Sequence, residues 1–495
     1  MLFNSYEFIF LFMPLVFTGF FFIASKNHRA AIAWLVAASI FFYGYWSPYA
    51  LPILLTSICL NYWLGSQLSK TELSYRKILL IISISANLLA LGYFKYVNFF
   101  IINTNSLRDF IGLDPLNNLD VILPIGISFF TFTQVAYLVD SFQKKTVEQS
   151  FLNYLLFVTF FPHLIAGPII HHKQMMPQFT DPETFSVSQK KIVLGITAFT
   201  IGLAKKLLLA DPLGAGAEKL FNIANAGGSP GFVTAWLGSF AYTFQMYFDF
   251  SGYSDMAVGL ALLFGIWLPF NFNSPLKATS IISFWQRWHM SLTSYINQYL
   301  YTPLTLKGMR LGIGRSKSIE LSCGLIIPTI TTMVIVGIWH GAGWTFVVFG
   351  AMHGVFLVVN HIWHKRNFCV RKKGQGPALS YVILSWFITF LSVTVALVMF
   401  RSDSVHIALQ IYEGMCGVNG FYNGMIYSTT QLLLLLTALF IVLYFKSSLV
   451  ILKSQDSEKK HYLIRGLGGA IFLAILFVSS VLQLSKTSPF LYFQF

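Results

Sequence analysis

Residues 325–360 read LIIPTITTMVIVGIWHGAGWTFVVFGAMHGVFLVVN, and they contain no Asp, Glu, Lys or Arg. Both sides of His340 are mostly apolar and long enough for helices that cross a bilayer. An ionisable residue inside such a stretch is costly, and it marks a functional site by default. Three glycines and two tryptophans close around His340. They predict a tightly packed pocket rather than a helix that simply faces lipid.

The composition extends this interpretation to the whole chain. Of the 495 residues 56% are hydrophobic and only 10% are charged, and the mean hydropathy is +0.66. Soluble domains average about 25% charged residues. We therefore expect an all-α polytopic membrane protein. Residues 1–495 are predicted to form one integral membrane domain with about 11–15 membrane-embedded segments.

The net charge of +15 does not indicate nucleic-acid binding, because the basic residues lie in short loops between apolar runs. Such loops set the orientation of inner-membrane proteins. Basic residues at 26–29, 70–77 and 144–145 follow alternate apolar segments, and further basic stretches lie at 365–373 and 453–465. The pattern predicts a multi-pass protein of the inner membrane with both termini on the periplasmic side. The four cysteines are scattered and predict neither a disulfide framework nor a zinc site.

Fifteen apolar segments are candidates for membrane-embedded helices. Those near 151–170 and 280–300 also carry Pro, His, Arg or several polar residues, so we expect re-entrant or broken helices there. The candidates are 6–24, 31–46, 50–68, 78–100, 121–140, 151–170, 191–210, 231–248, 253–270, 280–300, 321–339, 343–362, 379–400, 431–450 and 463–484.

Three further segments concentrate polar groups in apolar sequence. In FPHLIAGPII at 161–170, two prolines and a glycine around His163 should break a helix. In QMYFDFSGYSD at 245–255, a turn near Ser251 and Gly252 is expected to line a polar cavity. The residues expected at that cavity are Gln245, Asp249, Tyr253 and Asp255.

The third segment is SFWQRWHMSL at 283–292. On a continuous helix, Trp285 and His289 would share one face at the i, i+4 spacing, and Arg287 would point elsewhere. An amphipathic helix at the membrane interface is the alternative, since Trp and Arg are common there.

The residue types in these segments limit the kinds of reaction that the chain could catalyse. No histidine spacing matches a zinc pattern such as H-E-x-x-H, so no metal is expected. No G-x-S-x-G elbow is present for a serine hydrolase. What remains is an imidazole that acts as a general base on a hydroxyl, with a second histidine possible.

Four segments together resemble the membrane-bound O-acyltransferase family. The sequences FWQRWHMSLT at 284–293 and WHGAGWTFVVFGAMHG at 339–354 are similar to its two histidine motifs. The sequences PHLIAGP at 162–168 and YFDFSGYSDMA at 247–257 resemble the branch that contains the alginate O-acetylation membrane subunit. The resemblance covers nearly the whole chain, and the D-alanyl transfer protein of teichoic acid modification is a more distant relative.

The resemblance implies a helical core with broken helices, a central tunnel and a reaction centre within the membrane. It implies that His340 is the essential catalytic histidine and His289 the second one. On physical grounds we expect the substrate tunnel to be lined by Trp339, Gly341, Trp344, Trp285, Arg287 and His163. It further implies an acyl donor, acetyl-coenzyme A or another thioester, presented by the cytoplasm or a carrier. No cofactor is permanently bound. A periplasmic acetyltransferase of the serine-hydrolase-like type is the implied partner.

Two rival functions stay open at this point. The acyl group could be D-alanyl, or the acceptor another cell-wall polymer than an alginate-like polysaccharide. A transporter or scaffold for an acyl or lipid-linked species is the non-enzymatic alternative, because intramembrane His and Asp also mark transport pathways. The chain lacks the repeated halves that are common in secondary transporters.

Overall fold

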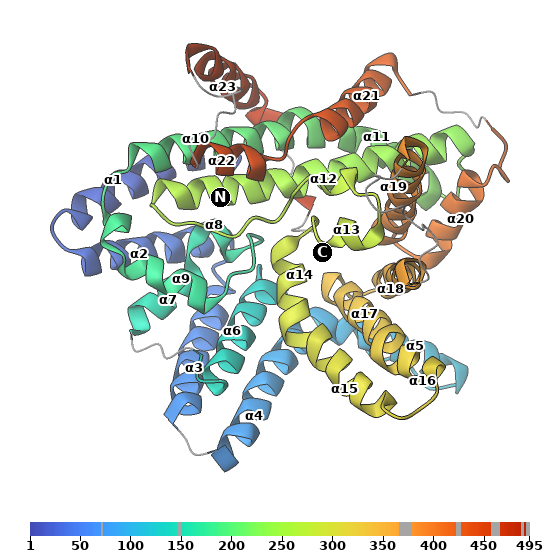
Figure 1. Cartoon of the computed structure of the whole chain (residues 1–495), viewed down its shortest axis with the longest axis horizontal. Helices are drawn as coiled ribbons and strands as arrows, with labels where there is room; N and C mark the ends of the chain where they lie inside the picture. The colour runs from blue at the N-terminus through green and yellow to red at the C-terminus, as the bar shows by residue number, and fades with distance from the viewer. Residues whose placement is uncertain are drawn as a thin grey trace. The chain divides into compact units, whose positions relative to one another are not determined.

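The computed structural model describes residues 1–70, 73–145, 150–365, 378–421, 427–456, 466–486 and 490–491. Every regular element in these residues is helical, which confirms the predicted all-α class (Figure 1). The basic stretches expected at 365–373 and 453–465 lie largely outside the described residues. The chain divides into two compact units. Unit 1 comprises Met1–Thr200 and Tyr253–Pro269, and unit 2 comprises Ile201–Gly252 and Phe270–Phe495.

Unit 1 is built around an aromatic core. Phe161 makes ring contacts with Phe8, Phe12 and Phe42, and Phe264 packs on Phe161. Helices α3, α4 and α6 pack on one another beside this core (Figure 1). The elements that contribute to unit 1 are η1 Phe8–Phe12, α1 Met13–Ala24, α2 His28–Trp46, α3 Leu51–Lys70, α4 Leu73–Leu91, η2 Gly92–Tyr96, α5 Val97–Phe110, α6 Ile127–Phe142, α7 Phe151–Thr159, α8 Phe161–Leu164, α9 His172–Thr180, η3 Pro182–Phe185, α10 Gln189–Ala204 and part of α12 Phe232–Leu263.

Unit 2 holds the remaining elements. Its first half comprises η4 Lys205–Ala210, α11 Asp211–Asn225, most of α12, η5 Pro275–Lys277, α13 Ile281–Trp285, α14 Met290–Ile296, η6 Asn297–Tyr301, α15 Thr302–Gly312 and α16 Lys317–Leu321. Its second half comprises η7 Ser322–Ile326, α17 Ile327–His340, α18 Trp344–Lys365, α19 Leu379–Arg401, α20 Val405–Met415, α21 Thr429–Tyr444, α22 Ser448–Asp456, α23 Gly466–Val481 and η8 Leu484–Lys486.

The apolar stretch around His340, residues 325–360, lies largely in the helical hairpin of α17 and α18 (Figure 1). A Cβ atom on Gly350 would collide with the Met333 carbonyl, and one on Gly354 would crowd the Ile330 Cα atom. Gly350 and Gly354 are the glycines of a G-x-x-x-G pattern on α18. Such small residues let two helix backbones approach closely where no hydrophobic force drives helices together.

Helix α12 corrects one prediction. The turn expected at Ser251 and Gly252 is absent, and a single helix runs from Phe232 to Leu263. A Cβ atom on Gly252 would lie only 2.7 Å from the carbonyl oxygen of Gly202, which lies in the end of α10 that belongs to unit 2. The glycine therefore serves close helix packing, and this tertiary contact overrides its low intrinsic preference for a helix.

The two interrupted segments are broken as predicted. Residues 151–170 divide into α7 and the single turn α8, and residues 280–300 divide into α13, a turn and α14. The helix expected over 121–140 begins later, at Ile127, after a left-handed Gly126.

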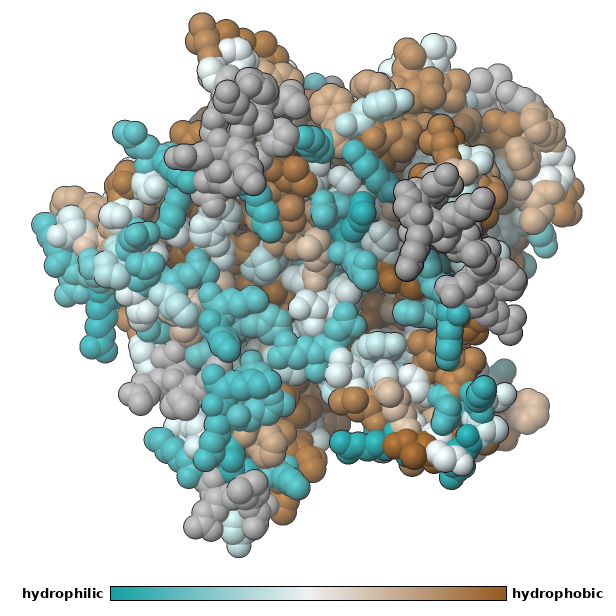
Figure 2. Space-filling view, viewed as in Figure 1, coloured by the Kyte–Doolittle hydropathy of each residue, from teal (hydrophilic) through white to brown (hydrophobic). Residues whose placement is uncertain are grey.

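Exposed apolar surface agrees with a membrane protein. Five described helical stretches are long and apolar enough to cross a bilayer: Tyr75–Phe110, Gln189–Asn225, Lys317–His340, Trp344–Lys365 and Leu379–Arg401. Shorter apolar helices include Thr429–Tyr444 and Gly466–Val481. Figure 2 shows hydrophobic side chains on the outer surfaces of α21 and α23, where a soluble protein would be mostly polar.

Candidate active site

His340 is the last residue of α17, and its side chain is only 8% exposed. Its imidazole makes ring contacts with Trp339 at a centroid distance of 5.0 Å and with Phe400 of α19 at 5.3 Å. Phe349 of α18 lies at 6.2 Å. The histidine therefore lies at the junction of three helices of unit 2, inside an aromatic cluster.

A small cavity of about 30 Å³ adjoins His340. Three helices each line it with side chains one turn apart, which is the spacing that puts residues on one helix face. Aromatic and aliphatic groups make up most of the wall, and no carboxylate contributes. The lining residues are Met246 and Phe250 of α12, Phe349 and His353 of α18, Val393, Leu397 and Phe400 of α19, and Phe284, Trp285, Trp288 and His340.

His289 does not lie on a continuous helix with Trp285. Helix α13 ends at Trp285 and α14 begins at Met290, so the shared i, i+4 face predicted for Trp285 and His289 is wrong. His289 itself has left-handed backbone angles, φ 45° and ψ 53°. Such angles are uncommon outside glycine, and strain of this kind gathers at functional sites.

Asn271 fixes the turn that holds His289. Its backbone carbonyl accepts from the Met290 amide at 2.9 Å, and its side-chain oxygen accepts from the Ser291 hydroxyl at 2.6 Å. The buried imidazole of His289 then meets Phe250 at 4.8 Å and Trp339 at 6.3 Å between ring centroids. The indole of Trp339 therefore contacts both predicted catalytic histidines, and Phe250 contacts His289 while lining the cavity at His340.

Trp285 joins the site through a different histidine. Its indole Nε1 donates a hydrogen bond to Nδ1 of His353 at 3.2 Å. Because Nδ1 accepts, the neutral His353 ring carries its proton on Nε2. Arg287, two residues further on, is half-buried, and its backbone carbonyl accepts from the Asn273 amide. Partial burial lowers the pKa of the nearby Lys277, and the positive charge of Arg287 lowers it further.

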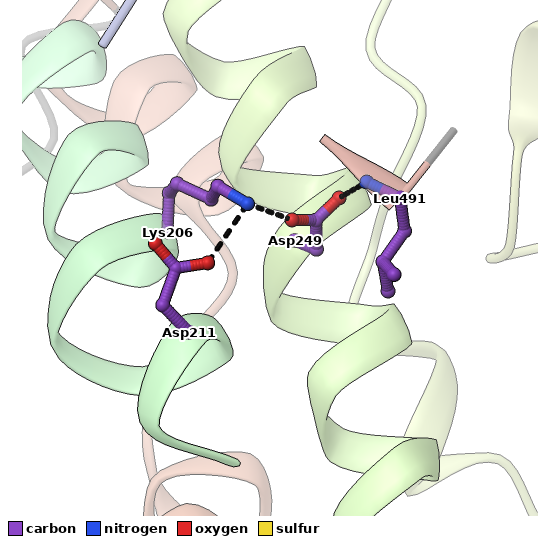
Figure 3. Close-up of polar contacts among 4 residues, drawn as sticks. All are labelled: Lys206, Asp211, Asp249 and Leu491. Atoms are coloured by element: carbon purple, nitrogen blue, oxygen red, sulfur yellow. Dashed lines mark hydrogen bonds and ion pairs between the residues drawn. The ribbon is translucent and has the colours of Figure 1, made fainter. Parts of the chain in front are cut away.

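Asp249 is held by other protein groups. Its Oδ1 pairs with Nζ of Lys206 at 2.7 Å, and its Oδ2 accepts from the Leu491 amide at 3.0 Å (Figure 3). Lys206 also pairs with Asp211 at 2.8 Å. Gln245, one turn earlier on α12, packs so closely on α11 that a Cβ atom on Gly214 would meet its amide. Both residues thus fasten α12, and any contact of theirs with substrate stays a prediction.

Three of the predicted site residues belong to unit 1. Tyr253 stacks on Phe3 with ring centroids 5.1 Å apart, and Asp255 is buried. Nε2 of His163 lies 2.9 Å from the Phe157 carbonyl oxygen. The prolines and glycine around His163 thus produce a broken helix with a hydrogen-bonded histidine inside it.

Two residues beside His340 differ from their expected roles. A Cβ atom on Gly341 would collide with the ring of Phe346, so this glycine makes room for a protein side chain. The side chain of Trp344 is 57% exposed and lines neither the cavity at His340 nor the larger cavity next to it. Trp339, by contrast, is buried against both histidines.

Sequence reasoning missed three residues that organise this region. Lys206 is a charged residue within an apolar run, and that alone marks it for attention. His353 lies in the second histidine motif, but no role is predicted for it from the sequence. No pattern in the sequence marks Asn271 as important, because its role comes from its hydrogen bonds to Met290 and Ser291. Among the described residues no group of three or more His, Cys, Asp or Glu side chains is arranged to hold a metal.

Comparisons with known proteins give a consistent result. The model of the MBOAT, membrane-bound O-acyltransferase family matches residues 49–400. A peptidoglycan O-acetyltransferase of Helicobacter pylori is 40% identical over 85% of this chain and 80% of its own length. A probable alginate O-acetylase of Pseudomonas putida is 34% identical over the full length of both chains. A teichoic acid D-alanyltransferase of Bacillus subtilis is 27% identical over 54% of this chain and 67% of its own length.

Proposed function

Because the chain belongs to the membrane-bound O-acyltransferase family and is an O-acyltransferase of the membrane, we propose that it passes an acetyl group across the inner membrane. The donor is a cytoplasmic thioester such as acetyl-coenzyme A, and the final acceptor is a hydroxyl of an envelope or exported glycan. The observation that carries the proposal is the buried cluster in which Trp339 contacts both His289 and His340.

His340 serves as the general base. The acceptor hydroxyl oxygen attacks the thioester carbonyl carbon while the imidazole takes the hydroxyl proton. The C–S bond then breaks. The imidazolium gives the proton to the leaving thiolate, so the thiol is released and the imidazole is neutral again. A positioned base of this kind contributes about 10²–10⁴-fold to a rate. The aromatic wall excludes water, which limits hydrolysis of the acyl group.

The cavity at His340 favours acetyl over D-alanyl. A D-alanyl group carries an ammonium, and a buried ammonium needs a paired carboxylate. None of the side chains that line this cavity is acidic. Two of the relatives named above, the more similar ones, are a peptidoglycan O-acetyltransferase and a probable alginate O-acetylase, so the proposed acceptor class is a polysaccharide of the envelope or an exported one.

The proposal includes how the protein lies in the membrane and how the acetyl group crosses it. Residues 1–495 act as one membrane domain with both termini periplasmic. A charged polymer does not cross hydrocarbon, whereas an acetyl group inside a protein tunnel does. A periplasmic acetyltransferase of the serine-hydrolase-like type would receive it and modify the polymer. What supports O-acetylation as the outcome is that two of the relatives are named as a peptidoglycan O-acetyltransferase and a probable alginate O-acetylase.

A vesicle experiment separates the enzyme from a transporter. Purified protein is reconstituted in liposomes with acetyl-coenzyme A labelled in the acetyl group on one side, and with the periplasmic acetyltransferase and a glycan oligosaccharide on the other. We expect free thiol on the donor side in step with acetyl ester on the oligosaccharide. The control is liposomes that hold the His340→Ala protein. Labelled donor that crosses intact, with no thiol released, would favour the transporter instead.

The left-handed backbone at His289 makes a second prediction possible. Asn tolerates this conformation, so His289→Asn should keep the turn between α13 and α14 while removing the imidazole. We expect acetyl transfer to fall by about 10²-fold or more, as for loss of a positioned acid or base. Transfer is measured by thiol release, and folding by size exclusion and thermal unfolding. A folded His289→Asn protein with wild-type transfer would show that only the turn matters.

A further inference from the structure

Two cavities in unit 2 share a single residue in their walls. The cavity at His340 measures about 30 Å³, and a second one of about 230 Å³ lies between α14, α17 and α18. Among the residues that the structure describes, Trp285 is the one that lines both. The indole therefore stands as a partition between the space at His340 and a much larger space.

The partition is fixed from two sides. The indole Nε1 donates to His353 of α18 at 3.2 Å, and the two rings meet edge to face at 5.2 Å. The Trp285 carbonyl accepts from the Thr293 hydroxyl of α14 at 3.1 Å. Both Trp285 and His353 are buried, and Phe284 stacks against His353 on the neighbouring side. Side chains held in this way resist displacement, because cores are close-packed.

The volumes decide what each space can hold. By this measure a water needs about 10–15 Å³, so the smaller cavity holds two or three atoms of that size. An acetyl group has three heavy atoms. The larger cavity holds on the order of fifteen such atoms. Its wall includes Leu292, Ile296, Met333 and Val336, which suit methylene groups.

We propose that the indole of Trp285, held by His353, is the residue that limits the transferred acyl group to acetyl. A butyryl or hexanoyl chain at His340 would run into the indole. Without the indole, the chain would extend into the larger cavity. The inference rests on the proposed acetyl transfer and deepens it, and the reaction step is the one already described.

The test compares acetyl-, butyryl- and hexanoyl-coenzyme A with wild-type and variant protein in lipid nanodiscs. The readout is the hexanoyl-to-acetyl ratio of thiol release in the presence of the periplasmic acetyltransferase and a glycan oligosaccharide. Trp285→Ala joins the two cavities, and we expect that ratio to rise by at least about 10-fold, since even one methylene in an apolar pocket is worth 10–200-fold. Trp285→Phe keeps a ring and should raise the butyryl ratio more than the hexanoyl ratio.

Two further variants make the test specific. Trp288 lines only the smaller cavity, so Trp288→Ala enlarges that space without joining it to the other, and the hexanoyl ratio should stay low. Leu357 lines only the larger cavity. Adding Leu357→Trp to Trp285→Ala refills that space and should remove the gain for hexanoyl.

Each outcome decides the proposal. An unchanged hexanoyl ratio in active Trp285→Ala and Trp285→Phe proteins would overturn it and leave acetyl transfer intact. Folded variants that lose all transfer would also overturn it, because the indole would then be needed for the reaction itself. Binding of the same thioesters, read as the shift in thermal unfolding, requires no turnover. If the wild-type protein transfers nothing, a hexanoyl-selective gain in binding by Trp285→Ala still supports the size limit, and its absence refutes it.

Discussion

Replacing His340 by alanine should abolish acetyl transfer, with glycan acetyl ester falling at least about 10²-fold, as expected when a positioned general base is removed. The imidazole lies within ring contact of Trp339 and Phe400 and lines the small cavity. Alanine leaves the end of α17 in place but provides no group that accepts the hydroxyl proton. The measurement is ester released by mild alkali from the glycan of cells that carry the variant.

A matched control comes from the same hairpin. His364 lies near the end of α18 with its side chain exposed, so His364→Ala changes a histidine without touching the cavity. We expect wild-type ester content from that protein. Membrane fractions must contain both variants at wild-type levels. Normal ester content in cells with His340→Ala would refute the role of His340.

Replacing Lys206 by methionine should cost about 3–5 kcal/mol of folding stability, because removing one partner of a buried ion pair leaves the other charge uncompensated. Lys206 is 1% exposed and pairs with both Asp211 and Asp249 (Figure 3). The ring of Phe490 also lies 4.8 Å from its Nζ. The loss should appear as a lower midpoint of thermal unfolding and less protein in the membrane.

The neighbouring lysine provides the control for this prediction. Lys205 is half-buried, and its Nζ lies 3.5 Å from the Ser448 hydroxyl. Lys205→Met should therefore cost less than Lys206→Met, since a typical hydrogen bond contributes about 0.5–1.5 kcal/mol to stability. Adding Asp249→Asn to Lys206→Met removes one unpaired charge and should restore part of the stability. If Lys206→Met unfolds at the wild-type temperature, the ion pairs of Lys206 with Asp211 and Asp249 do not hold α11 and α12 together.

The ion pair of Lys206 also helps to place the side chains of α12 that line the cavity. Asp249 faces Lys206, while Met246 and Phe250 of the same helix line the cavity at His340. The same stretch of α12 thus contributes a carboxylate to the buried ion pair and two side chains to the wall of the cavity. Asp249, interpreted from sequence as a polar group at a turn, thus acts first as a fastening of the helix.

The sequence alone determined the class of the protein and its principal histidine. A chain with so few charges must satisfy its backbone within lipid, and helices do this with their own hydrogen bonds. Two prolines and a glycine near His163 predicted a broken helix, since proline removes a backbone donor. His340 was conspicuous because an imidazole in apolar sequence is costly.

Only the tertiary structure decided how these parts meet. The left-handed turn at His289 depends on Asn271, the close packing of α12 at Gly252 depends on Gly202, and the position of the Trp285 indole depends on His353. Each pair is distant in sequence, so no local pattern of residues encodes the contact. Packing in a close-packed interior selects one arrangement among those that local preference allows. That selection brought His289 against Trp339, the sequence neighbour of His340, left Trp344 outside the cavity and placed Trp285 in the walls of two spaces.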